Sequence, residues 1–139
     1  MGGHALTSCR DLFAIPEAGF STSPAVIAEK PLVVKGMVRA ILRGTAVARV
    51  SKEETLDSIL RHNHYITREL ASLAYDEVHK EWGPVLDFEA YQRKVDIYTS
   101  EWNLPKKPVS DYYNFKYLKE ALDELGMLRS WDPRMDLIE

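Results

Sequence analysis

The sequence predicts a mainly α-helical chain with one or two short strands near its N-terminus. Beyond residue 23, apolar side chains recur at spacings of three and four residues, in segments that begin at capping residues and end at Gly, Asn or Pro. Only residues 12–15 and 19–22 read as extended, and Pro16 and Gly19 favour a turn or an irregular crossing there. Helices joined by short connectors therefore dominate the predicted fold.

Two prolines mark the first helices. Ser23-Pro24 predicts a one-turn helix, because a serine hydroxyl accepts from free amides and proline loses nothing where its missing N–H had no partner. Pro31 repeats this signal for a longer helix, which we expect to end at Gly44. The apolar side chains that share one face of this helix are Val34, Met37, Val38, Ile41 and Leu42.

Four further helices are expected after Ser51, Thr67, Asp87 and Asn114, with the last ending at Gly126. Ser51 to Glu54 has the spacing of a capping box. The side chains expected to face inward are Leu70, Leu73, Ala74 and Val78 after Thr67, then Phe88, Tyr91, Val95, Tyr98 and Trp102 after Asp87, then Tyr117, Leu118, Ala121, Leu122 and Leu125 in the last helix.

Composition sets limits on the class of protein. The 139 residues are 45% hydrophobic and 28% charged, as in one globular domain of ordinary make-up. The net charge of −3 gives no support for a nucleic-acid partner. No apolar run reaches the roughly 18 residues of a membrane span, and the N-terminus lacks the pattern of a secretion signal. Cys9 is the only cysteine, so no internal disulfide is possible.

The element order carries a family resemblance. The chain matches a pattern of glutamate, proline, valine, V-R-A and R-G that opens a helical run. The matching residues are Glu29-Lys30-Pro31, Val34, Val38-Arg39-Ala40 and Arg43-Gly44. Residues 67–71 and 111–126 match two later helices of the same order. Over residues 13–128 the chain thus resembles the C-terminal part of ABC-importer solute-binding proteins of the nitrate, sulfonate and thiamine-precursor group.

The resemblance implies the C-terminal portion of a type II periplasmic-binding-protein α/β fold. It implies a flexible N-terminus over residues 1–12, part of the solute-binding domain over 13–128 and an irregular tail over 129–139. The chain would then be a piece of a longer protein whose N-terminal region supplies most of the sheet and of the solute contacts. The implied function is capture of a small anionic or heterocyclic solute for an ABC permease, in the periplasm or another extracytoplasmic compartment.

Four polar residues are the candidates for solute contact: Glu17, Ser21, Thr22 and Ser23. The resemblance places them where the chain recrosses between two lobes, and hydroxyls with amides at a helix start favour an anionic group. Ser23 is equally explained as a helix cap.

No motif predicts an enzyme, a cofactor or a metal site. His62 and His64 would point apart on a helix, and no acidic residue or cysteine nearby completes a ligand set. The aromatic residues of two later helices form either a packed core, which we favour, or the lining of a cleft; they are Tyr91, Tyr98, Trp102, Tyr112, Tyr113 and Tyr117. The alternative function is a helical interaction module that self-associates through the Val34, Val38 and Ile41 face.

Overall fold

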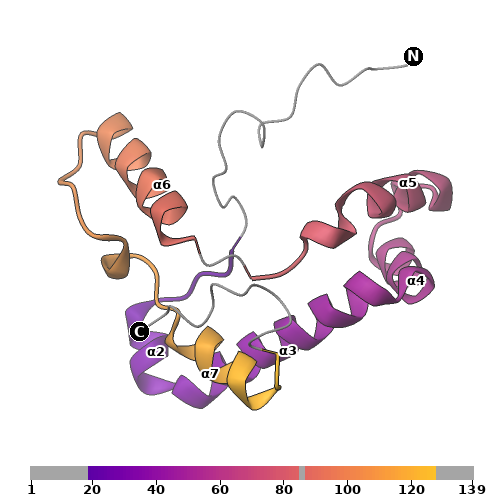
Figure 1. The fold of residues 1–139 in the computed structure, drawn as a ribbon, viewed down its shortest axis with the longest axis horizontal. Coiled ribbons are helices and arrows are strands. Elements are labelled where there is room, and N and C mark those ends of the chain that lie inside the picture. Colours follow the sequence, from indigo (N-terminus) through magenta and orange to yellow (C-terminus); the bar gives the residue numbers. More distant parts are fainter. Residues whose placement is uncertain (1–18, 85–86, 128–139) are drawn as a thin grey trace. The chain divides into compact units, whose positions relative to one another are not determined.

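A computed structural model describes residues 19–84 and 87–127 of the chain, and helices account for 72% of these residues (Figure 1). The mainly helical class is therefore confirmed. In chain order the helices are α2 (Pro24–Glu29), α3 (Pro31–Val50), α4 (Lys52–His62), α5 (Arg68–Val78), the 3₁₀ helix η1 (His79–Glu81), α6 (Phe88–Glu101), the 3₁₀ helix η2 (Val109–Asp111) and α7 (Lys116–Glu124).

The strand expected at residues 19–22 is not formed, and the described residues contain no strand at all. A strand needs a second extended segment to take its backbone hydrogen bonds, and the described ranges offer none. The strand expected at residues 12–15 lies outside the described residues, as do the segments 1–12 and 129–139.

The chain divides into two compact units. Among the described residues, the larger unit comprises 24–84 and 116–127 and so contains α2, α3, α4, α5, η1 and α7. The smaller unit comprises 19–23 and 87–115, with α6 and η2. Each unit has its own buried side chains: Leu42, Thr55, Leu56, Ala71, Tyr75, Ala121 and Leu122 in the larger, Ala90, Val95 and Thr99 in the smaller.

Helix α3 runs through Gly44 to Val50, so the helix end expected at Gly44 is wrong. Glycine ends helices by adopting a positive φ, and Gly44 is not among the glycines that do so. One glycine costs about 1 kcal/mol relative to alanine inside a helix. That cost is small because Thr45 to Val50 supply another stretch without proline, in which the Thr45 hydroxyl donates to the Ile41 carbonyl at 2.9 Å.

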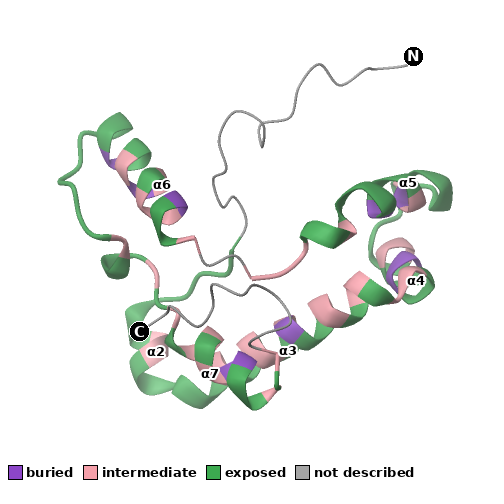
Figure 2. Cartoon of the chain, viewed as in Figure 1, coloured by how far each residue is buried: buried purple, intermediate pink, exposed green. Residues whose placement is uncertain are grey.

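Helices α3 and α7 pack against each other and bury Leu42 on one and Leu122 on the other (Figure 2). Lys35 forms ion pairs with Glu120 and Glu124, and Arg39 pairs with Glu124 at 2.9 Å. The hydrogen bond and charge of Glu124 raise the pKa of Lys35, and Lys35 in turn lowers the pKa of Glu124. These exposed pairs orient the two helices more than they stabilise them.

The expected end of α7 at Gly126 is confirmed. Gly126 has a φ of +65°, its N–H donates to the Asp123 carbonyl at 2.9 Å, and the Met127 N–H donates to the Leu122 carbonyl at 2.8 Å. This is the Schellman arrangement, in which a residue in the left-handed conformation satisfies carbonyls of the last helical turn.

Helices α4 and α5 form a hairpin around Leu56, Ala71 and Tyr75. The Tyr75 hydroxyl donates to the Arg49 carbonyl at 3.1 Å, which links this hairpin to the end of α3. The inward face expected for α5 is wrong, because Leu70 and Leu73 are exposed. The small side chain of Ala71 allows α4 to approach, and this close approach turns the Ala71 and Tyr75 side of α5 inward.

In the smaller unit, Gln92 joins α6 to the chain that follows it. Its Nε2 donates to the Lys107 carbonyl at 3.2 Å and to Asp96 at 3.0 Å, while its Oε1 accepts from the Val109 N–H at 2.8 Å. Asp87 caps α6 as expected, accepting from the Ala90 N–H at 3.0 Å. The amide of Gln92 thus holds the segment that leads into η2.

Two cap positions that look alike in the sequence differ in the structure. The Thr67 hydroxyl accepts from the Leu70 N–H at 3.2 Å, as expected. Ser51 precedes α4 but its side chain makes no capping hydrogen bond, so the capping box is wrong. Ser51 is the one residue between α3 and α4, and its backbone already serves both helices: its N–H donates to Val47 and its carbonyl accepts from Thr55.

This contrast predicts unequal effects of alanine at the two positions. Thr67→Ala should lower the free energy of unfolding by about 1 kcal/mol, because it removes a formed cap. Ser51→Ala should change it by less than about 0.5 kcal/mol, as at an ordinary surface position. Urea unfolding followed by circular dichroism measures both. An equal loss at the two positions would show that Ser51 caps α4 in solution.

Candidate functional site

The residues expected to contact a solute lie in the segment before α2. Ser21, Thr22 and Ser23 are exposed and follow one another directly, while Glu17 lies outside the described residues. Among the described residues, no hydrogen bond joins Ser21 or Thr22 to another polar side chain, and both residues are exposed. They are consecutive hydroxyls at the start of a six-residue helix rather than a pocket.

The aromatic residues divide into two groups. Tyr91 lies 4.6 Å from Tyr113 and 5.2 Å from Phe115, measured between ring centroids, and Phe88 meets Phe115 edge-on at 5.2 Å. Burial, followed by the proximity of Tyr113, raises the pKa of Tyr91. This group packs the smaller unit, which confirms the core interpretation for Tyr91 and Tyr113.

Tyr98 and Trp102 behave differently, because they are 46% and 68% exposed. Their rings lie 5.8 Å apart near the end of α6. The inward position expected for them is therefore wrong. Positions 91, 95 and 98 lie near one another on a helix. The buried side of α6, however, is formed by Ala90, Val95 and Thr99.

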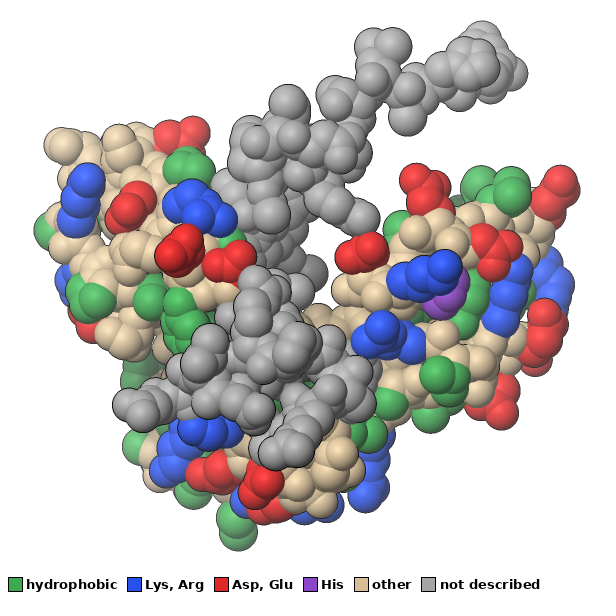
Figure 3. Space-filling model, in the orientation of Figure 1, with side chains coloured by type: hydrophobic (Ala, Val, Ile, Leu, Met, Phe, Trp, Pro, Cys, Tyr) green, Lys and Arg blue, Asp and Glu red, His purple; other side chains and the backbone are tan. Residues whose placement is uncertain are grey.

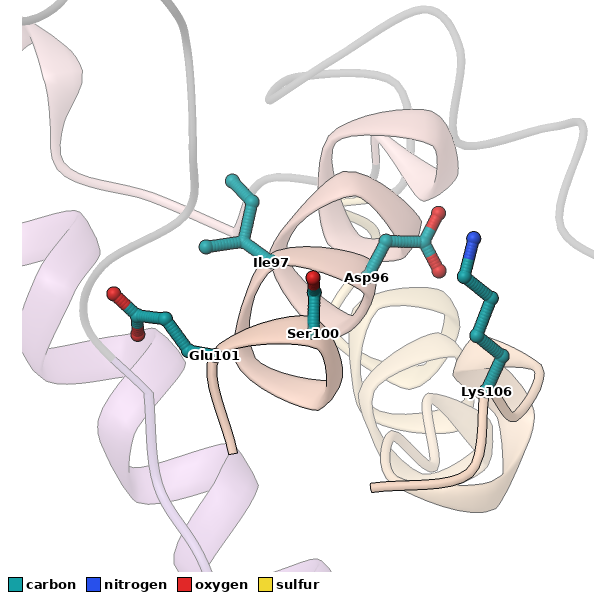
Figure 4. Close-up of a pocket in the computed structure, with 5 residues that line it drawn as sticks. All are labelled: Asp96, Ile97, Ser100, Glu101 and Lys106. Carbon is teal, nitrogen blue, oxygen red and sulfur yellow. The ribbon is translucent and has the colours of Figure 1, made fainter. Parts of the chain in front are cut away.

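A shallow hollow of about 460 Å³ lies beside α6, lined by Asp96, Ile97, Ser100, Glu101 and Lys106 (Figure 4). The acidic end of Asp96 points toward the side where Lys106 lies, whereas Glu101 points the other way. Asp96 is already bonded to Gln92. The two carboxylates diverge, so the hollow does not place an acid and a base around one reacting atom.

Two of the described histidines, His62 and His79, are hydrogen-bonded to nearby carbonyls. The Nδ1 atoms of His62 and His79 lie 2.8 Å from the carbonyls of Ser58 and Tyr75, one helical turn earlier. His79 also stacks on Tyr75, with 4.6 Å between the ring centroids, and is half-buried. Within residues 19–84 and 87–127, no group of three or more His, Cys, Asp or Glu side chains is placed to hold a metal ion.

The largest feature that sequence reasoning missed is an apolar surface on α3. Hydrophobic side chains reach the surface of both units (Figure 3), and on α3 the exposed ones fall on one side. We call this side the outer face of α3. It consists of Leu32, Val33, Gly36, Met37, Ala40, Arg43, Gly44, Val47 and Val50, all of which are exposed.

The face that the sequence indicated is the opposite one, and most of it is partly covered. Val34, Val38 and Ile41 are half-buried and Leu42 is buried, whereas Met37 is 61% exposed. The signal for the outer face was present as the spacing of Val33, Met37, Ala40, Gly44 and Val47. It was missed because two sides of this helix have apolar residues at helical spacing, and the sequence analysis chose the other side.

None of the described helices combines the length and the apolar content needed to cross a membrane. Comparison of the chain with known protein families, curated proteins and solved structures finds no match.

Proposed function

We propose that this chain is the C-terminal part of the solute-binding component of an ABC importer, from the group that binds nitrate, sulfonates and thiamine precursors. The positions of the helix ends support the proposal. α3 begins at Pro31 directly after Glu29-Lys30, α5 begins after Thr67, and α7 ends at Glu124, two residues before its stop signal Gly126. These are the boundaries that the resemblance predicts. In this role the protein would hold a small anionic or heterocyclic solute in an extracytoplasmic compartment and pass it to a permease.

The α/β part of the proposed fold would come from a longer polypeptide. The described residues are helical, and α3 continues beyond Arg43-Gly44, where the resemblance predicted its end. A helix that is apolar on two sides is normally buried on both. In the complete binding protein we therefore place a sheet against the outer face of α3.

Solute contact is proposed for Ser21, Thr22 and Ser23, together with Glu17. Free amides and hydroxyls at the start of a helix favour an anionic group. Since these residues are exposed, they would form one wall of a site whose other walls belong to the rest of the protein.

This arrangement predicts that the isolated chain does not bind the family's anions tightly. Calorimetric titration with nitrate or with ethanesulfonate should give no affinity better than about 1 mM, because exposed hydroxyls gain little over water. Micromolar binding that is lost in a Ser21→Ala, Thr22→Ala variant would contradict the prediction and would show that this segment is sufficient for binding.

The neighbourhood of the gene tests the class of function separately. The proposal expects coding sequences for a permease and an ATPase beside this one, and for a first lobe upstream. Co-expression with that lobe should then create micromolar solute binding. Neighbours unrelated to transport, with no such lobe, would reject the proposal.

A second candidate function is a helical interaction module that self-associates. The outer face of α3 favours it, because exposed apolar side chains that lie together on one side of a helix are typical of protein interaction sites. The sequence-based version, association through Val34, Val38 and Ile41, requires surface that is already half-covered. Neither candidate function is enzymatic.

A further inference from the structure

No further inference is drawn: the strongest candidate, the exposed surface patch of Tyr98 and Trp102 near the end of α6, is an unpartnered apolar surface, and nothing in the described part of the chain shows what covers it.

Discussion

Replacing Leu122 with alanine should lower the free energy of unfolding of the larger unit by about 2–5 kcal/mol. Leu122 is fully buried, and Leu122 and Leu56 are the largest side chains with almost no exposure in the described part of the chain. With so few large buried side chains between α3 and α7, little neighbouring mass is available to fill the cavity. A loss of this size is a large fraction of the 5–15 kcal/mol that stabilises a typical domain.

The matched control is Leu73→Ala. It removes the same atoms from a helix, but Leu73 is 63% exposed, so the change should stay within about 0.5 kcal/mol. Urea unfolding followed by circular dichroism compares the two midpoints at constant slope. Similar losses for both variants would mean that the outer side of α5 is covered in solution, and that the burial described for the two leucines does not hold there.

Proline at position 44 should destabilise the larger unit by about 3 kcal/mol or more, whereas alanine should stabilise it by about 0.5–1 kcal/mol. Gly44 lies six residues before the end of α3, so proline would remove a helical hydrogen bond and clash with the preceding turn. Alanine fits because nothing lies within 4 Å of an added Cβ.

Thermal unfolding of both variants decides the point. The unmodified chain should unfold between them, with Gly44→Pro lower and Gly44→Ala higher. If Gly44→Pro instead unfolds like the unmodified chain, α3 ends at Gly44 in solution, as its sequence alone suggested. Gly36→Ala serves as a control, because it raises helix propensity at a position that lies in the interior of α3 whether or not the helix ends at Gly44.

Most local signals predicted this fold correctly, and the exceptions are Ser51 and Gly44. Thr67, Asp87 and Gly126 each act on backbone groups within three or four residues of themselves, and each does in the structure what its residue type predicts. Helix existence was predictable for the same reason. The apolar side of α7 was also predicted correctly, because its apolar residues leave only one face that can be buried.

Choices between two apolar faces were not predictable. In α5, both the Leu70 and Leu73 side and the Ala71 and Tyr75 side have helical spacing. The position of α4 decides between them, and a single segment carries no information on its neighbour. The same ambiguity hid the outer face of α3. The candidate residues Ser21, Thr22 and Ser23 were placed correctly next to a helix start, but whether anything encloses them is a tertiary property.

The single residue between α3 and α4 determines how this chain tolerates changes in its length. Each residue added at Ser51 would extend a helix and turn everything beyond it by about 100°. The hydrogen bond from Tyr75 to Arg49 and the burial of Leu56 would then be lost together. The segment after α6, near Leu104, is exposed and its hydrogen bonds involve mainly backbone atoms. It can therefore become longer without rotating the helices that follow. Insertions among homologous sequences should therefore gather near Leu104 and be rare at Ser51.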